Sequence, residues 1–451
     1  MKNLVMIGLP GCGKTTLGRR LAQKLGREFV DIDKEIEKSC GVSIPQIFAE
    51  HGETYFRDCE SAVIREYERR EGLVIATGGG AVLREENAKT LCANGFVIFI
   101  DRPVGNICAD VKIANRPLLQ KGAAAVEELS EKRRPIYEKT ANAIVDASGE
   151  IGDVLLQLEM LAATLAASGY AVIGDPIGHS LSPQLHKTAF SALNIDESYV
   201  AVHAPRGQLS SFVAAVRCSR IKGFNATIPH KQDIIPLLDE IDDEAQLCGA
   251  VNTVVHKNGI LKGYNTDMEG LSLALKQAGH GFGCRNILLL GAGGAARAVA
   301  LKAGLEKAKA LHIAARSITK AEELAAHVRA ATGLAVSVSG AAESELEAAC
   351  RHSDLIINAT PLGMSGMTQD HESLEFLAVM PRSGLVCDLV YNPLETSLLC
   401  RARELGIDTL NGLGMLVFQA LIAQELFFDK KLEKQKLFAI ILQRLEREFR
   451  A

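Results

Sequence analysis

The fold of the first third of the chain is decided by the stretch Gly8-Leu9-Pro10-Gly11-Cys12-Gly13-Lys14-Thr15. It matches the pattern Gly-x-x-x-x-Gly-Lys-Ser/Thr, in which backbone N–H groups turn toward phosphate oxygens. The apolar run Leu4–Ile7 precedes it, and the amphipathic segment Thr15–Leu25 follows it and stops at Gly26. A strand, a glycine loop and a helix in this order predict a nucleoside triphosphate site at the positive end of the helix.

Each part of this loop has an expected task. The Lys14 ammonium would reach the β- and γ-phosphates, and the Thr15 hydroxyl would coordinate Mg²⁺. The residues that we expect to contact the nucleotide are Gly8, Gly11, Cys12, Gly13, Lys14, Thr15 and Thr16. The motif indicates the phosphate donor and gives no information about the acceptor.

Around the loop, short apolar runs alternate with amphipathic segments. The expected strands are Leu4–Ile7, Phe29–Ile32, Leu73–Ala76, Phe96–Ile100 and Ile144–Asp146, and the expected helices are Thr15–Leu25, Glu53–Glu68, Ala124–Lys139 and Asp153–Ala166. Strands without polar alternation are buried on both faces. The first 165 residues therefore predict a parallel sheet with helices on both sides.

Length and composition limit the possible functions. The chain has 451 residues, which allows about three domains. Apolar residues make up 47% and charged residues 23%, typical of a globular protein. Lys and Arg total 50 and Asp and Glu total 54, a net charge of −4 that argues against a nucleic-acid partner.

No stretch has the roughly 20 strongly apolar residues of a membrane span, and the first residues lack the features of a leader peptide. The eleven cysteines form no Cys-x-x-Cys pair. We expect reduced, mostly buried thiols in a cytoplasmic protein rather than a disulfide framework or a zinc site.

A second alternating series follows the small residues Ala167–Gly169, which we take as the domain boundary. Its expected strands are Tyr170–Gly174, Tyr199–His203 and Gly223–Ile228, and a hairpin turns at Asn258-Gly259, a pair suited to a type I′ turn. A helical stretch begins after Asp267, and apolar helices close the chain from Leu413 onward.

A glycine loop of another kind lies in the last third. Gly291, Ala292, Gly293, Gly294 and Ala295 follow the expected strand Ile287–Leu290 and open a helix, the arrangement of a dinucleotide site. The next strand ends at Ala315, Arg316 and Ser317, with Lys320 nearby and no acidic residue for a ribose 2′-hydroxyl. This favours NADP(H) over NAD, although basic residues at a solvated helix start are the alternative explanation.

Polar residues around the first loop point to its acceptor. Asp31 and Asp33 lie at an expected strand end, Arg57 lies on a helix with Glu60, and Gly78–Gly80 close a strand; Arg116 and Arg133 follow. Singly these are weak indications, since Asp31 and Asp33 could be a solvated strand end. In this order and spacing, residues 1–165 resemble shikimate kinase.

The resemblance implies a role for each of these residues. Asp33 would orient and deprotonate the acceptor hydroxyl, while Arg57 and Arg133 would grip the substrate carboxylate, as a guanidinium fork can. Gly78, Gly79 and Gly80 would let the backbone approach the ring. Arg116 would lie on a lid and neutralise the transferring phosphoryl group, and Asp31 would assist Mg²⁺. The family usually carries an arginine against adenine where this chain has Ala109.

The second series carries its own ordered set of polar residues. These are Ser180, Ser182, Asn225, Thr227, Lys231, Asn252, Asp267, Tyr391 and Gln419. Taken one at a time, the serines could be helix caps, Asn252 a turn residue and Lys231 a surface lysine. As a set they resemble shikimate dehydrogenase, and the likeness covers residues 170–430.

This second resemblance also implies roles. Lys231 and Asp267 would be the acid–base pair for a ketone reduced by NADPH. Ser180 and Ser182 would hold the substrate carboxylate, and the ring hydroxyls would be bound by Asn225, Thr227, Asn252 and Gln419. Tyr391 is also expected among the substrate-binding residues. Leu389 and Gly412 join the residues expected to contact the cofactor.

The whole chain therefore predicts an α/β protein with three parts. A P-loop domain like the nucleoside-monophosphate kinases spans 1–165, a substrate lobe spans 170–266 with 412–451, and a Rossmann NADP-binding lobe spans 267–411. The expected function joins reduction of 3-dehydroshikimate to phosphorylation of shikimate by ATP, with small molecules as the partners and no indication of oligomeric state. The alternatives are a sensor or repressor that has lost catalysis, and a quinate dehydrogenase using NAD joined to a small polyol kinase.

Overall fold

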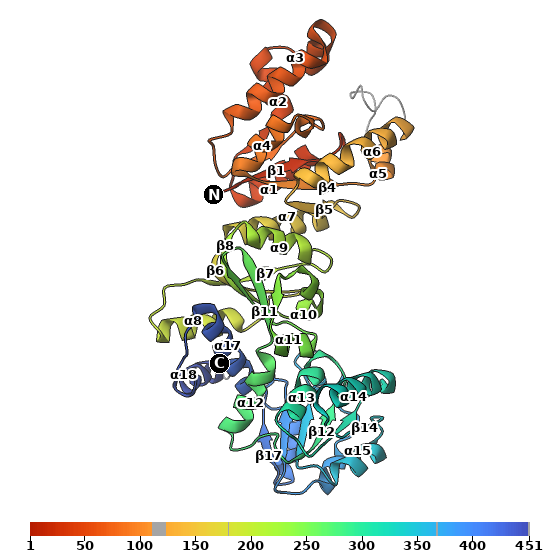
Figure 1. The fold of residues 1–451 in the computed structure, drawn as a ribbon, viewed down its shortest axis with the longest axis vertical. Helices are drawn as coiled ribbons and strands as arrows, with labels where there is room; N and C mark the ends of the chain where they lie inside the picture. Colours follow the sequence, from red (N-terminus) through yellow and green to blue (C-terminus); the bar gives the residue numbers. More distant parts are fainter. Residues whose placement is uncertain (111–122, 179, 367–368, 450–451) are drawn as a thin grey trace. The chain divides into compact units, whose positions relative to one another are not determined.

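The computed structural model describes residues 1–110, 123–178, 180–366 and 369–449, and its strands form three sheets (Figure 1). The predicted α/β class is confirmed. In each sheet the apolar strands predicted from the sequence are found within three residues of their expected limits, the largest difference being at Gly223–Ile228, where β8 begins at Arg220. The glycine loops therefore lie where strand turns into helix, as the motifs require.

The first sheet is five-stranded and wholly parallel, in the order β2-β3-β1-β4-β5. Every residue of β1 is buried, because helices cover both faces. Its elements are β1 (Asn3–Ile7), α1 (Lys14–Leu25), β2 (Phe29–Asp31), α2 (Ile32–Cys40), α3 (Ile44–Glu66), β3 (Val74–Ala76), η1 (Ala81–Leu83), α4 (Glu85–Asn94), β4 (Gly95–Asp101), α5 (Val104–Asp110), α6 (Ala123–Thr140), β5 (Ala143–Asp146) and α7 (Ile151–Ala166).

One local expectation was wrong. The strand predicted over Phe29–Ile32 ends at Asp31, and Ile32 already begins α2. Ile32 and Ile36 lie four residues apart and are both fully buried, so helical spacing serves the core better than an extended chain here. Asp33 therefore lies in the first turn of α2 and not on a strand. The helix predicted from Glu53 is also longer than expected, since α3 begins at Ile44 and kinks at Gly52.

The second sheet has six strands in the order β7-β6-β8-β10-β11-β9 and is mixed. The predicted hairpin is confirmed, with positive φ angles at Asn258 and Gly259. The elements of this stretch are β6 (Ser168–Gly174), α8 (Ser182–Ala192), β7 (Tyr199–His203), α9 (Leu209–Arg217), β8 (Arg220–Ala226), α10 (His230–Asp233), η3 (Ile235–Leu237), β9 (Glu240–Ile241), α11 (Asp243–Cys248), β10 (Thr253–Lys257) and β11 (Ile260–Tyr264).

The third sheet is parallel, in the order β14-β13-β12-β15-β16-β17, which is the doubly wound dinucleotide order. From Asp267 to the end of the described chain the elements are α12 (Asp267–Gln277), β12 (Asn286–Leu290), α13 (Gly294–Leu305), β13 (Ala310–Ala314), α14 (Ile318–Thr332), β14 (Val336–Ser339), α15 (Glu343–Cys350), β15 (Leu355–Asn358), η4 (Glu375–Val379), β16 (Leu385–Asp388), α16 (Ser397–Glu404), β17 (Asp408–Leu410), α17 (Leu413–Phe428) and α18 (Lys434–Phe449). The last two helices, α17 and α18, pack with α8.

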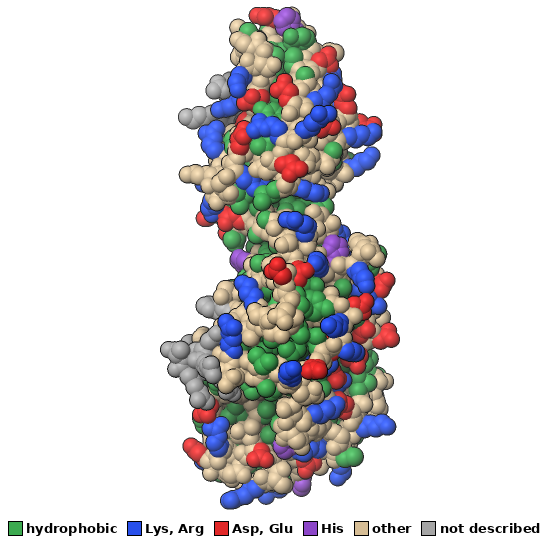
Figure 2. Space-filling model, turned by 90° about the vertical axis from the view of Figure 1, so that its left-hand side faces the viewer, with side chains coloured by type: hydrophobic (Ala, Val, Ile, Leu, Met, Phe, Trp, Pro, Cys, Tyr) green, Lys and Arg blue, Asp and Glu red, His purple; other side chains and the backbone are tan. Residues whose placement is uncertain are grey.

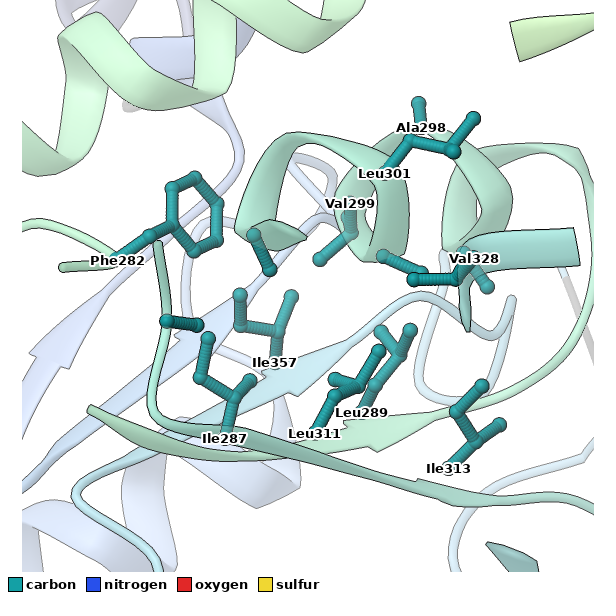
Figure 3. Close-up of a cluster of buried hydrophobic side chains, with 14 of the residues drawn as sticks. Phe282, Ile287, Leu289, Ala298, Val299, Leu301, Leu311, Ile313, Val328 and Ile357 are labelled. Atoms are coloured by element: carbon teal, nitrogen blue, oxygen red, sulfur yellow. The ribbon is translucent and has the colours of Figure 1, made fainter. Parts of the chain in front are cut away.

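Alternate residues of β12 face two separate cores. Figure 3 shows Leu289 beneath the helices, packed against Val299 of α13 and Val328 of α14. Leu288 points to the other face, where it packs with Phe376. Both faces are apolar, which explains why this strand has no polar alternation in the sequence.

The chain divides into two compact units. The first comprises Met1–Gly178, Val200–Ile221 and Ile228–His230, and the second comprises the rest of the described chain. The predicted boundary at Ala167–Gly169 is very short in the structure, because α7 ends at Ala166 and β6 begins at Ser168. The predicted limits of the three parts stay a prediction.

Surface charge is mixed on the face shown in Figure 2, where Lys and Arg side chains are interspersed with Asp and Glu. Within the four described ranges, we find no helix whose length and apolar character would let it cross a bilayer. All eleven cysteines are unpaired thiols, but only four of them are buried, so the expectation that most would be buried was wrong.

Candidate active sites

The phosphate loop has the backbone that its glycines predict. Gly8, Gly11 and Gly13 all have positive φ angles, and Gly13 is the residue that precedes α1. A Cβ on Gly8 would lie 2.8 Å from the Ile100 carbonyl oxygen, so a side chain does not fit there. Cys12 is buried, whereas Thr16 is exposed on the first turn of α1. The loop and helix start can thus surround an anion with N–H groups.

Lys14 is buried and bonded to its own loop. Its ammonium donates to the carbonyl oxygens of Gly8 and Leu9, each at 2.8 Å. Beside it, the Thr15 hydroxyl donates to Asp31 Oδ2 at 2.8 Å. A hydroxyl and a carboxylate at this spacing are oxygen ligands of the kind that Mg²⁺ prefers, so the predicted metal residues lie together.

The acceptor side of this site converges on Gly78, Gly79 and Gly80. A Cβ on Gly78 would lie 2.7 Å from Asp33 Oδ1, and one on Gly80 would overlap the Arg57 guanidinium. Arg133 donates to the Gly79 carbonyl oxygen at 2.8 Å. Asp33, Arg57 and Arg133 therefore meet around this glycine turn, as expected from the sequence. Arg116 lies outside the described residues.

Glu60 is a site residue that the sequence analysis named only as a neighbour of Arg57. It is fully buried and accepts from Arg57 at 2.7 Å. Its other oxygen, Oε1, would lie 2.9 Å from a Cβ on Gly78 and has no hydrogen-bond partner in the described part of the chain. Burial raises the pKa of the Glu60 carboxyl, and the Arg57 guanidinium opposes that rise. The i,i+3 spacing was the signal that could have identified it.

In the second unit, Lys231 and Asp267 form an ion pair of 2.6 Å between Nζ and Oδ2. Lys231 lies on α10 and Asp267 begins α12. The Asn252 amide donates to Asp267 Oδ1 at 2.8 Å and to the Thr266 hydroxyl at 2.9 Å, and Gln419 Oε1 lies 3.5 Å away. Asn252, Thr266 and Gln419 are almost wholly buried, whereas Lys231 is one-third exposed. A buried hydrogen-bond network thus fixes Asp267, and Asp267 orients the Lys231 ammonium, which is still accessible from solvent.

Thr266 was missed by the sequence analysis, although it directly precedes Asp267. Burial raises the pKa of Tyr391, and the Lys231 charge counters that rise, so the tyrosine lies within electrostatic range of the lysine.

Ser182 begins α8, and its N–H donates to Ser180 Oγ at 3.3 Å. Thr227 follows β8. The part of both serines and of Thr227 in substrate binding stays a prediction.

A second layer of contacts fixes Asn225. The Tyr199 hydroxyl donates to Asn225 Oδ1 at 2.6 Å, and the Asn225 amide donates to the Asn252 carbonyl oxygen and the Thr253 hydroxyl. Tyr199 stacks on His186, with ring centroids 4.0 Å apart. Both rings are fully buried, and burial lowers the pKa of His186 to about 3.

The dinucleotide loop also fits its predicted ligand. Gly291 has a φ of 107°, and a Cβ there would lie 3.0 Å from Thr360. Gly294 begins α13, so Ala292, Gly293 and Ala295 lie at a helix N-terminus. Leu389 and Gly412 come together, since a Cβ on Gly412 would overlap the Leu389 carbonyl. Ala315 is buried, and Arg316, Ser317 and Lys320 are exposed at the start of α14, where a 2′-phosphate could be bound.

Comparison with known proteins fits this geometry. Residues 172–254 match the family model of the shikimate dehydrogenase substrate binding domain. The NADP-dependent shikimate dehydrogenase of Symbiobacterium thermophilum is 42% identical over 261 residues, which cover 58% of this chain and 88% of that relative. The chain belongs to the shikimate dehydrogenase family.

Solved structures extend the likeness to the fold. A shikimate 5-dehydrogenase from Thermus thermophilus, in complex with NADP(H) and shikimate, is 33% identical with a TM-score of 0.54, covering 61% of this chain and 99% of that one. A quinate dehydrogenase from Corynebacterium glutamicum, in complex with NAD, is 29% identical with a TM-score of 0.56 and covers the same shares. Residues 287–369 match the model of the saccharopine dehydrogenase NADP binding domain.

The first third of the chain lies outside the shikimate dehydrogenase part. Residues 10–161 match the family model of shikimate kinase. The five-stranded sheet with the phosphate loop is therefore a shikimate kinase domain. The chain thus combines a shikimate kinase domain with a shikimate dehydrogenase part.

Proposed function

We propose that this chain is a bifunctional enzyme. Its dehydrogenase part reduces 3-dehydroshikimate to shikimate with NADPH, and its kinase part transfers the γ-phosphoryl group of ATP to a hydroxyl of shikimate. The observation that carries the first half is the Lys231–Asp267 pair of 2.6 Å beside a dinucleotide lobe without an acidic residue at the end of β13. The second half rests on Asp33, Arg57 and Arg133, which meet at the glycine turn next to the phosphate loop.

In the dehydrogenase part, NADPH supplies a hydride to the ketone carbon when it is bound at the glycine loop. The ketone oxygen then gains negative charge, and the Lys231 ammonium can donate a proton to it. Asp267 orients that ammonium, and Asn252 in turn fixes Asp267 through its other oxygen. The network also surrounds the substrate with buried polar groups, which penalises analogues that lack a hydroxyl.

In the kinase part, Asp33 would accept the proton of the attacking hydroxyl while Arg57 and Arg133 bind the carboxylate. Mg²⁺ would be held by Thr15 and Asp31, and it would neutralise charge on the phosphate oxygens. Lys14 would exchange its bonds to the Gly8 and Leu9 carbonyls for bonds to phosphate. The departure at Ala109 bears on adenine binding alone.

The two alternatives differ in what supports them. A sensor that has lost catalysis is not favoured, because the charged residues that catalysis needs are present and lie at bonding distance. A quinate dehydrogenase using NAD has one observation in its favour, the likeness to the Corynebacterium protein. Arg316 argues for NADPH instead, since a guanidinium suits a 2′-phosphate. A cytoplasmic location is part of the same proposal.

A coupled assay of the purified chain tests the proposal. With 3-dehydroshikimate, NADPH and MgATP together, we expect NADPH to be consumed and ADP to be released, and ADP release to need NADPH when no shikimate is added. Parallel reactions with shikimate or quinate and with NADP⁺ or NAD⁺ identify the preferred pair. Activity with quinate and NAD⁺ alone, or no ADP release with shikimate, would refute the corresponding half.

A further inference from the structure

Two thiols lie in contact beside the kinase site. Cys40 is the last residue of α2 and Cys59 lies in the second half of α3, and their sulfur atoms are 3.6 Å apart. Both side chains are half-buried, so small oxidants can reach them from solvent. The two helices pack against each other (Figure 1).

The same two helices carry the acceptor side of the site. Asp33 lies in the first turn of α2, and Arg57 and Glu60 flank Cys59 on α3. The Arg57 guanidinium lies beside Gly80 and is bonded to Glu60 on the same helix, so a shift of α3 would carry both side chains relative to the glycine turn. A covalent link between α2 and α3 would therefore act on the residues that bind the substrate.

We propose that Cys40 and Cys59 form a disulfide when the protein meets a peroxide, and that this link slows the phosphoryl transfer that we propose above. A disulfide needs a sulfur–sulfur distance of about 2.05 Å, so the two sulfurs must approach by about 1.5 Å. Side-chain rotation supplies part of that approach, and in our proposal movement of α2 against α3 supplies the rest. An error of about 1 Å in a catalytic site costs roughly a hundredfold in rate.

The chemistry balances with hydrogen peroxide as the oxidant. One thiolate sulfur attacks a peroxide oxygen, an S–O bond forms as the O–O bond breaks, and the products are a sulfenic acid and a hydroxide that takes a proton to become water. The other thiol then attacks the sulfenic acid sulfur, the S–S bond forms as the S–O bond breaks, and a second water leaves. The two thiols lose two electrons and two protons, and the peroxide gains them. Because burial raises the pKa of Cys40, the reaction is expected to be faster at alkaline pH.

The test uses the full chain, whose dehydrogenase activity serves as an internal control. After treatment with hydrogen peroxide and alkylation of the remaining thiols, peptide mass spectrometry should find a Cys40–Cys59 linked peptide. We expect kinase activity to fall tenfold or more, dehydrogenase activity to stay within twofold, and dithiothreitol to restore the kinase. The mass spectrum shows whether the disulfide forms, and this result does not depend on whether shikimate is the substrate.

Matched variants separate this pair from the other thiols. Cys40→Ser or Cys40→Ala should keep the untreated kinase activity and resist the peroxide. Cys92→Ser, which removes an exposed thiol on α4, should respond like the parent protein. The proposal is overturned if no linked peptide forms, if it forms without loss of kinase activity, or if Cys40→Ser is inactivated as fast as the parent.

Discussion

The dehydrogenase site and the kinase site hold their positively charged side chains in different ways. Lys231 lies against Asp267, and the partners that orient this pair, Asn252 and Thr266, are buried and bonded to one another. Lys14 donates to two carbonyls of its own loop, and Arg133 donates to the carbonyl of the glycine turn. The first site is arranged for chemistry before any ligand binds, whereas the second must exchange protein acceptors for ligand oxygens.

This difference has a physical origin. The proton donor of a hydride transfer acts on one oxygen, so a single lysine in a rigid network is enough. Phosphoryl transfer spreads charge over several oxygens, which calls for several cations that meet only around the ligand. Each of the following changes tests one side of this comparison.

The largest effect is expected at Lys231. Lys231→Ala removes the proton donor, so kcat of the dehydrogenase should fall roughly 10²- to 10⁴-fold while kinase activity is unchanged. Steady-state assays of both activities on one preparation measure this. Lys222→Ala, an exposed lysine bonded to Glu197, is the control and should change neither activity. A dehydrogenase near the parent level in Lys231→Ala would refute the assigned role.

Asp33→Asn is the counterpart in the kinase part. Loss of the proton acceptor should lower kinase kcat by about 10²-fold or more and leave NADPH oxidation unaffected. ADP release at saturating shikimate and MgATP is the measurement. The matched control is Asp58→Asn, because Asp58 is an exposed carboxylate on α3 bonded to Arg84. An effect of equal size in both variants would argue against a specific role for Asp33.

Arg316→Ala tests how the cofactor is chosen. A charge-assisted hydrogen bond to phosphate contributes about 1.5–3 kcal/mol, so KM for NADPH should rise roughly 10- to 100-fold. KM for NADH, which lacks the 2′-phosphate, should change little. Arg329→Ala is the control, because Arg329 lies on α14, the helix that begins just after Arg316 and Ser317, and is bonded to Glu322. Parallel increases for both cofactors would contradict a 2′-phosphate contact.

His186 should make the dehydrogenase part sensitive to acid. Its pKa is about 3 when folded and 6.5 when unfolded, so below about pH 6.5 the unfolded chain binds a proton that the folded chain does not. Stability is therefore lost as pH falls, by about 2 kcal/mol at about pH 5. The loss should show in the urea midpoint for dehydrogenase activity and be absent from His186→Gln. His51→Gln, at a half-exposed histidine, should retain it.

The smallest effect is expected at Tyr199. Tyr199→Phe keeps the stack on His186 and removes only the bond to Asn225, worth about 0.5–1.5 kcal/mol. KM for shikimate should rise about two- to tenfold, with kcat and KM for NADP⁺ nearly unchanged. In an Asn225→Ala background the same change should have no further effect on KM. Additive effects on KM would mean that Tyr199 acts on substrate binding by a route other than its bond to Asn225.

The sequence predicted the glycine loops well, because each needs positive φ angles or close approach of the backbone to its ligand at fixed spacing. It also predicted the Lys231–Asp267 pair through the resemblance. It failed at Asp33, where the burial of Ile32 and Ile36 turned an expected strand end into a helix. A run of four residues is too short for a period of 3.6 to be told from a period of 2.

The supporting contacts could not be predicted for a different reason. Gln424 and His186 are bonded at 3.1 Å although 238 residues separate them. Tyr199 lies on β7 and Asn225 on β8, two strands that are separated in the sheet by β6, so their meeting depends on the register of all three strands. Such pairs have no local spacing, so only the folded chain brings them to light.

The short connection at Ala167, between α7 and β6, bears on how the protein resists proteolysis. A single residue separates the last turn of α7 from β6, and its N–H is still bonded to Ala163. Such a joint gives proteases no extended loop to cut. Because one polypeptide contains both parts, we expect them to be synthesised and degraded together and so to be present in equal amounts.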